Sequence, residues 1–132
     1  MLFPIKNHDI WKIYKTFLAS FWTVEEISNL HMDVKDWEQK LTENEKHFIK
    51  HILAFFSSAD QLICCNLLER FGSEITVPEA RQFYYYQIFN ESIHAETYAL
   101  LIDTYISDPE EKVRVLRAIE TIPVIKKKAQ FV

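Results

Sequence analysis

Glycine is almost absent from this sequence, which has one glycine among 132 residues. The tight hairpin turns of β-sheets draw on glycine because it takes positive φ angles at no steric cost, so a β-rich fold is not expected. Cysteine is also scarce. Cys64 and Cys65 are adjacent and are the only two cysteines, a pattern that fits neither a disulfide framework nor a zinc site. This usage is typical of a reducing compartment, and we predict a cytoplasmic protein.

An excess of positive charge is missing too. The net charge of −4 gives no electrostatic footprint for nucleic acid, and the short run Lys126–Lys128 is interpreted as a solvated surface, so no nucleic-acid partner is expected. No apolar run approaches the roughly 18 uninterrupted residues of a membrane span, and the first residues lack the pattern of a secretory signal. We therefore expect no membrane association.

What is present is apolar and aromatic material, 48% and 14% of the residues respectively, enough for a buried core. Thr42 and Glu45 form a capping-box pattern that predicts the start of a long helix. The following run contains neither glycine nor proline as far as Phe71. Gly72 is predicted to end this helix in the left-handed conformation.

A second long helix is predicted by Thr76 as its cap, Pro78 in its first turn and Glu79 reaching back to the cap. This helix should stop at Asp108-Pro109, because a proline at this position cannot continue it.

Shorter elements flank the two long helices. We predict a first helix over His8–Trp22, a capping box at Thr23–Glu26, an irregular surface connection with a short turn of helix from Ser28 to Leu41, and a short helix over about Pro109–Ile122.

The two long helices should pack as an antiparallel hairpin, since a short connection joins them. Each would be about 40–45 Å long at 1.5 Å per residue. Both are apolar on more than one side, so a hairpin alone would leave apolar surface exposed. We predict an all-α fold in which residues 1–132 form a single incomplete domain, about half of a helical bundle.

The second long helix carries one inward-facing seam with spacings of three and four residues. Its members are Tyr84, Gln87, Glu91, His94, Tyr98, Leu101 and Tyr105. The first long helix carries an apolar stripe of Ile49, Ile52, Phe56, Ile63 and Leu67, with Asp60 inside it.

Two carboxylates and an imidazole on such stripes need a partner, because an unpaired buried charge costs several kcal/mol. A metal ion is a suitable partner, since Glu-x-x-His is a usual way for a bundle to present ligands inward. Carboxylates with imidazole suit Fe or Mn. The pattern alone is equally compatible with a hydrogen-bonded core histidine at His94 and a core tyrosine at Tyr98.

Four segments of the chain carry a more specific resemblance. They read DIWKIYKTFLASFWTVEEI, FIKHILAFFSSADQLICCNLLERF, PEARQFYYYQIFNESIHAETYALLIDTYISDPEEK and AIETIPVIKKKAQF, and together they cover nearly the whole chain. The sequence resembles the small, radical-generating subunit of class I ribonucleotide reductase, of the eukaryotic and large-DNA-virus type.

That resemblance implies a ferritin-like bundle that holds two metal ions between four helices, as a di-iron centre or with Mn/Fe or Mn. It implies that Asp60, Glu91 and His94 are metal ligands. Tyr98 matches the tyrosine that is oxidised to a stable radical, and Trp22 matches the tryptophan that transfers the radical toward the large subunit. The large subunit reduces ribonucleotides to deoxyribonucleotides.

The chain departs from the family pattern in length. The family's subunit continues with two further helices that carry a Glu and another Glu-x-x-His, and no second Glu-x-x-His follows His94 here. Gln61, Cys64-Cys65 and Tyr85 also replace the residues usual in relatives.

Three interpretations follow. The leading one is the N-terminal portion of a small subunit, inactive alone and completed by a C-terminal polypeptide. In the second, another copy of the chain completes the site as a homodimer. In the third, which Gln61 and Tyr85 favour, the chain is a catalytically inactive helical interaction module.

Overall fold

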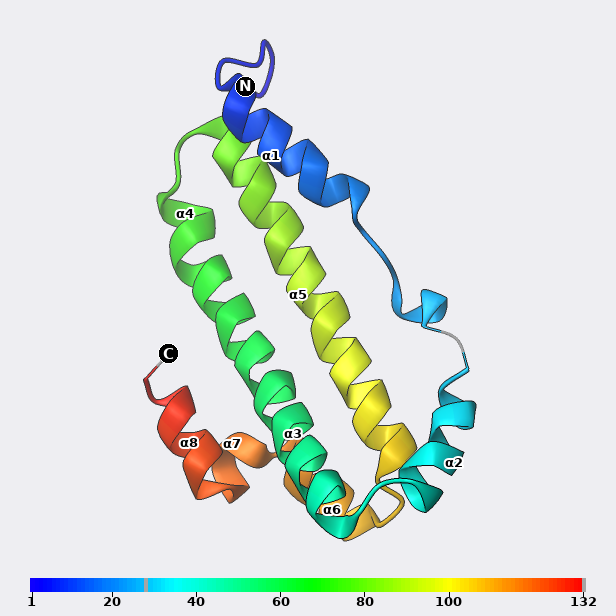
Figure 1. The fold of residues 1–132 in the computed structure, drawn as a ribbon. Helices are drawn as coiled ribbons and strands as arrows, with labels where there is room; N and C mark the ends of the chain where they lie inside the picture. Colours follow the sequence, from blue (N-terminus) through cyan, green and yellow to red (C-terminus); the bar gives the residue numbers. More distant parts are fainter. Residues whose placement is uncertain (28, 132) are drawn as a thin grey trace.

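In a computed structural model the chain is all-helical, as predicted, and the structure describes residues 1–27 and 29–131. Helices α3 (Glu43–Asn66) and α5 (Pro78–Tyr105) lie side by side and antiparallel, and the shorter helices surround them (Figure 1). The predicted hairpin of two long helices is thus confirmed.

Helix α3 begins at the predicted capping box. The Glu45 amide donates to Thr42 Oγ1 at 3.3 Å, and the Thr42 amide donates to Glu45 Oε2 at 2.8 Å. Two backbone donors that would otherwise lack helical partners are thereby satisfied.

The predicted end of this helix at Gly72 is wrong. The chain continues through a π-helical segment, η2 (Leu67–Phe71), and a last turn, α4 (Gly72–Glu74), before it becomes extended at Ile75. Gly72 has a right-handed φ of −62°. A Cβ atom at Gly72 would lie 3.3 Å from the Leu67 carbonyl oxygen, so glycine here allows a close backbone approach in the wider π-helical turn.

The predicted cap of α5 is also wrong, although Pro78 does occupy the first turn. Val77 holds the cap position without a side-chain hydrogen bond. The Glu79 carboxylate instead accepts hydrogen bonds from the Lys6 amide at 2.7 Å and from the Asn7 amide and side chain at 3.1 and 3.0 Å. Glu79 is buried, and it ties the N-terminal segment to the start of α5.

The Glu79→Gln variant should be less stable than the wild type at pH 7. Hydrogen bonds from the Asn7 side chain and the two amides lower the pKa of Glu79 from 4.5 to about 2. Because the folded pKa is lowered, the stabilisation is full above about pH 4.5 and is lost as the pH falls toward 2. Urea unfolding should show a lower midpoint for the variant at pH 7 and a shrinking difference on acidification. Equal midpoints at pH 7 would contradict this role.

Helix α1 (His8–Ala19) packs along the first half of α5 and ends three residues before Trp22, shorter than predicted. The Phe17 ring meets Phe83 edge-on at 5.3 Å, and the Tyr86 hydroxyl donates to the Phe17 carbonyl at 3.0 Å. The predicted capping pattern at Thr23 opens the 3-10 turn η1 (Val24–Glu26), where the Thr23 amide donates to Glu26 Oε1 at 3.0 Å.

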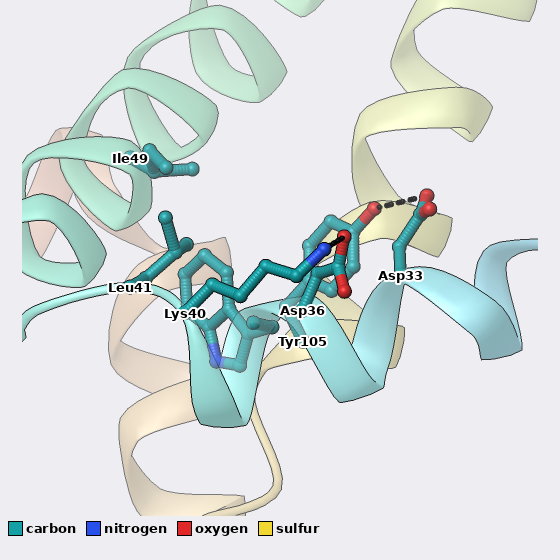
Figure 2. Close-up of a pocket in the computed structure, with 7 residues that line it drawn as sticks. Asp33, Asp36, Lys40, Leu41, Ile49 and Tyr105 are labelled. Carbon is teal, nitrogen blue, oxygen red and sulfur yellow. Dashed lines mark hydrogen bonds and ion pairs between the residues drawn. The ribbon is translucent and has the colours of Figure 1, made fainter.

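The segment predicted to be irregular with a short turn of helix is more regular than expected, because helix α2 (Leu30–Gln39) extends over 10 residues. The first residue of this segment, Ser28, lies outside the described residues. Helix α2 docks on the end of α5 through Trp37, which stacks on Tyr105 at 5.1 Å. The Tyr105 hydroxyl donates to Asp33 at 3.2 Å (Figure 2). A cavity of about 380 Å³ lies beside this contact. Tertiary contacts therefore order a segment whose own sequence signals are weak.

The single short helix predicted over Pro109–Ile122 is divided. Helices α6 (Pro109–Leu116) and α7 (Ala118–Thr121) break at Arg117, and α8 (Pro123–Ala129) follows. They pack on α3 and build the main hydrophobic core with it and with the end of α5. Its buried members are Leu53, Ala54, Ile102, Ile106, Val115, Ala118, Ile122 and Ile125.

The continuous helix Glu43–Glu74 is long and apolar enough to cross a membrane, since an 18-residue stretch of it has a mean hydropathy of 1.3. This membrane-length helix was not predicted from the sequence, because polar residues interrupt its apolar run. Helix α5 packs on one side of it and α6 to α8 pack on another, and it carries the buried polar residues Ser58 and Asp60. This packing is that of a core helix in a helical bundle.

Candidate metal centre

The three predicted metal ligands meet between the two long helices. Asp60 comes from α3, and Glu91 and His94 come from α5. One potential ligand atom from each lies within 4.8 Å of the others. His94 Nδ1 is 3.1 Å from Glu91 Oε2 and 3.9 Å from Asp60 Oδ2. The helical spacing of Glu91 and His94 thus brings their side chains together, as predicted, and hairpin packing adds Asp60.

Asp60 carries the clearest sign of a missing partner. Its Oδ2 atom is buried and accepts no hydrogen bond from any residue that the structure describes. Burial raises the pKa of Asp60, the Glu91 carboxylate raises it further, and His94 opposes the rise. A buried carboxylate oxygen without a donor is unfavourable in water-excluding surroundings, and a cation at this position would satisfy it.

The donor set fits a divalent metal ion. Two carboxylates and one imidazole are ligands that Fe and Mn accept, and they come from two rigid helices. The carboxylate side chains of Asp60 and Glu91 are 10% and 15% exposed, and that of His94 is 31% exposed. The cluster is therefore largely shielded but open on one side.

The Asp60→Asn variant should stabilise the metal-free protein at pH 7 by about 1 kcal/mol, the lower end of the cost of an unsatisfied buried polar group. The new amide could donate to Glu91 and would remove one of two neighbouring negative charges. Because the pKa of Asp60 is raised, its destabilising charge is lost as the pH falls, so the gain should shrink on acidification. Chemical unfolding in a chelator measures both effects, and a destabilised variant would contradict this account.

Asn90 is a site residue that the sequence analysis missed. Its side-chain Nδ2 lies 3.1 Å from His94 Nε2. Both contacts of the His94 ring are hydrogen bonds when the Asn90 side-chain amide donates to Nε2 and the Nδ1–H group of His94 donates to Glu91. Nδ1 is thereby directed toward the carboxylates, and metal binding at Nδ1 would release its proton. The signal was available, since Asn90 precedes His94 by one helical turn.

Tyr98 lies one turn beyond His94 and is half-buried. The Phe56 ring stacks on it at 5.5 Å with an interplanar angle of 16°. Burial raises the pKa of the Tyr98 phenol, and the nearby Asp60 and Glu91 carboxylates raise it further. The phenol is therefore protonated at neutral pH and shielded on one ring face.

Trp22 lies in the connection between α1 and η1, outside any helix. Its half-buried indole stacks on the His94 ring at 5.8 Å with an interplanar angle of 27°. The structure thus brings Trp22 to the same cluster as Asp60, Glu91 and His94, although 72 residues separate it from His94 in the chain.

A cleft of about 420 Å³ borders the cluster and is lined by Asp60, Glu91 and Cys64, among others. Cys64 and Cys65 are both free thiols. Burial raises the pKa of Cys64, and the nearby Cys65 and Glu91 raise it further. This cysteine is therefore a thiol at neutral pH. A small, uncharged thiol therefore faces the cleft.

Comparison with known proteins agrees with this geometry. The family described as "Ribonucleotide reductase, small chain" matches residues 1–132. The ribonucleoside-diphosphate reductase small subunit of Dictyostelium discoideum is 57% identical over 99% of this chain and 38% of its own length. The corresponding small chain of Swinepox virus is 56% identical over 99% of this chain and 47% of its own length.

Among solved structures, the ribonucleotide reductase Rnr4 homodimer from Saccharomyces cerevisiae superimposes with a TM-score of 0.82 at 40% identity, over 99% of this chain and 41% of the yeast chain. This likeness confirms the expected ferritin-like helical bundle. The chain spans less than half the length of each of these relatives.

Proposed function

Because this chain belongs to the ribonucleotide reductase small chain family, we propose that it supplies half of a di-metal site and the radical tyrosine of a ribonucleoside-diphosphate reductase small subunit. The completed subunit would support reduction of ribonucleotides to deoxyribonucleotides by a large subunit. Residues 1–132 would then be one incomplete ferritin-like domain, inactive alone and acting in the cytoplasm.

Asp60, Glu91 and His94 would hold the metal ions, with two Fe ions as the first expectation and Mn/Fe or Mn as pairs that suit the same donors. When bound, the ions would react with dioxygen and supply the oxidising power for the tyrosine. The unsatisfied Asp60 oxygen and the convergence of three donors support this assignment. The remaining ligands would come from outside this chain.

Tyr98 would be the residue that loses an electron and a proton. Its half-buried position and the stacked Phe56 ring support this role, because an oxidised phenol persists only where water and reductants are excluded. Its protonated state at neutral pH means that the proton must leave when the ring is oxidised.

Trp22 would transfer the radical between this site and the large subunit. The contact between its indole and the His94 ring supports the proposal, since stacked rings give short distances for electron transfer.

The observation that carries the proposed function is the buried Asp60 oxygen at the centre of the cluster, in a chain of this family. The test is co-expression with the part of the Dictyostelium discoideum small subunit that this chain does not match. The complex would be loaded with Fe(II) without oxygen and then exposed to air.

Metal, a tyrosyl signal in electron paramagnetic resonance, and nucleoside diphosphate reduction with the Dictyostelium large subunit are the expected results. A stable complex without bound metal would overturn the proposal and favour the inactive helical interaction module.

A further inference from the structure

Two histidines lie one helical turn apart near the start of α3, away from the candidate metal centre. The rings of His47 and His51 have centroids 4.1 Å apart and an interplanar angle of 43°. The two residues precede Asp60 by 13 and 9 positions, which corresponds to about 14–20 Å along the helix at 1.5 Å per residue. The histidine pair is therefore separate from the cluster of Asp60, Glu91 and His94.

A hydrogen bond of His51 determines which of its ring nitrogens can bind a metal ion. His51 Nδ1 lies 2.8 Å from the backbone carbonyl oxygen of His47. A carbonyl oxygen only accepts hydrogen bonds, so Nδ1 carries the proton and Nε2 of the neutral ring has a free lone pair. Metal-binding histidines usually donate their other ring N–H group to a carbonyl or a carboxylate in this way. His51 thus already has the tautomer that binds a metal ion through Nε2.

Two imidazoles on one helical turn define the class of ion. Imidazole suits Zn(II), Cu(II) and Ni(II), whereas Mg(II) and Ca(II) prefer oxygen ligands. Metal–nitrogen bonds of about 2.0–2.1 Å place two ligand nitrogens about 3 Å apart, and small side-chain rotations of rings whose centroids are 4.1 Å apart can reach this spacing. Histidines at positions i and i+4 of a helix are known to bind Zn(II) together. Cu(II) should bind most tightly of the three.

We propose that His47 and His51 form a chelating site for one Cu(II), Ni(II) or Zn(II) ion. Each histidine contributes one ring nitrogen, and water fills the other positions around the ion. Both ligands belong to one helix, so the site is complete within this chain. The inference goes beyond the proposed function and does not depend on it, because it uses none of the ligands Asp60, Glu91 and His94.

The charges near the pair do not by themselves attract cations. Glu43 lies one turn before His47, and its carboxylate is paired with the Lys46 ammonium group at 2.9 Å. Lys128 of α8 lines a cavity of about 120 Å³ together with His51. Negative charge therefore does not dominate around the two imidazoles, and chelation by nitrogen provides the affinity. The site should accordingly discriminate against Mg(II) and Ca(II).

The test is titration of the full chain, produced without a histidine tag, with Cu(II)–iminodiacetate. Iminodiacetate occupies part of the coordination sphere of Cu(II) and leaves room for two imidazoles, whereas the cluster around Asp60 can offer only the imidazole of His94. The expected result is one Cu(II) per chain, with the electron paramagnetic resonance signature of two coordinated imidazoles. Excess Mg(II) should not displace the ion.

His47→Ala and His51→Ala should each weaken Cu(II)–iminodiacetate binding at least about tenfold and leave the signature of one imidazole. The physical reason is that the second imidazole of the pair binds within the same molecule as the first. Alanine favours helix, and circular dichroism verifies that both variants are folded. His31→Ala is the matched control, because His31 is an exposed histidine of α2 that has Lys35, and not another histidine, one turn later.

A wild-type signature of one imidazole, equal affinities of the wild type and both alanine variants, or a chain that binds no Cu(II)–iminodiacetate overturns the inference. Glu91→Gln separates this site from the other centre and should leave Cu(II) at the histidine pair. Loss of Cu(II) in Glu91→Gln with retention in His47→Ala would place the ion at the cluster around Asp60 and overturn the inference. The co-expressed complex tests the proposed function separately, so either can fail while the other stands.

Discussion

Replacing Tyr98 with phenylalanine should abolish the tyrosyl signal of the completed, iron-loaded subunit and reduce nucleotide reduction to background. The variant removes only the hydroxyl group, so the ring can still stack on Phe56. Phenylalanine, however, has no hydroxyl proton that could leave together with an electron. Metal content should not change, because the three proposed ligands, Asp60, Glu91 and His94, are all retained. Electron paramagnetic resonance and metal analysis of the same sample separate the two effects.

Tyr105→Phe is the control for this experiment. Tyr105 belongs to the same seam of α5, but its hydroxyl contacts Asp33 of α2 at 3.2 Å, away from the ligands. This variant should keep the radical signal. A signal that survives in Tyr98→Phe and disappears in Tyr105→Phe would show that the wrong tyrosine has been assigned.

The Glu91→Gln variant should weaken metal binding at least about 100-fold. Replacing a residue that only hydrogen-bonds to a metal ligand typically lowers metal affinity about 10–100-fold, and Glu91 is itself a proposed ligand. The substitution keeps the shape of the side chain and removes one of two negative charges beside His94 Nδ1, which lies 3.1 Å from the Glu91 carboxylate. Equilibrium dialysis against Mn(II) or Fe(II) without oxygen measures the effect directly.

Glu96→Gln is the matched control, because Glu96 is an exposed residue on the same helix. This variant makes the same chemical change and should bind metal as the wild type does. If both variants bind metal equally well, the cluster is a hydrogen-bonded structural feature and not a metal centre.

The cluster could be predicted from the sequence because helical periodicity determines which residues share a side. Glu91, His94 and Tyr98 follow one seam, and Asp60 interrupts an otherwise apolar stripe. When the two helices pack through these sides, Asp60 has few positions to occupy other than one near Glu91 and His94. The residue types and their spacing already suggested that Asp60, Glu91 and His94 bind a metal, whereas the radical roles of Tyr98 and Trp22 came only from the family resemblance. All five assignments stay predictions.

Contacts between distant parts of the chain could not be predicted. The pattern around Thr76 favoured a local capping box, but Glu79 binds Lys6 and Asn7, which are 73 and 72 residues away. Helix α2 likewise depends on Trp37 packing against Tyr105. Gly72 suggested a helix end because glycine commonly takes positive φ, whereas here it allows close backbone packing in a right-handed turn.

The unsatisfied oxygen of Asp60 has a consequence for the lifetime of the protein in a cell. A ligand that binds only the folded state adds about 1.4 kcal/mol of stability for each tenfold excess over its dissociation constant. A chain whose central carboxylate lacks a donor until a metal ion arrives would therefore unfold, and be degraded by proteases, more often when metal is scarce. Its abundance would follow the supply of metal without a dedicated sensor.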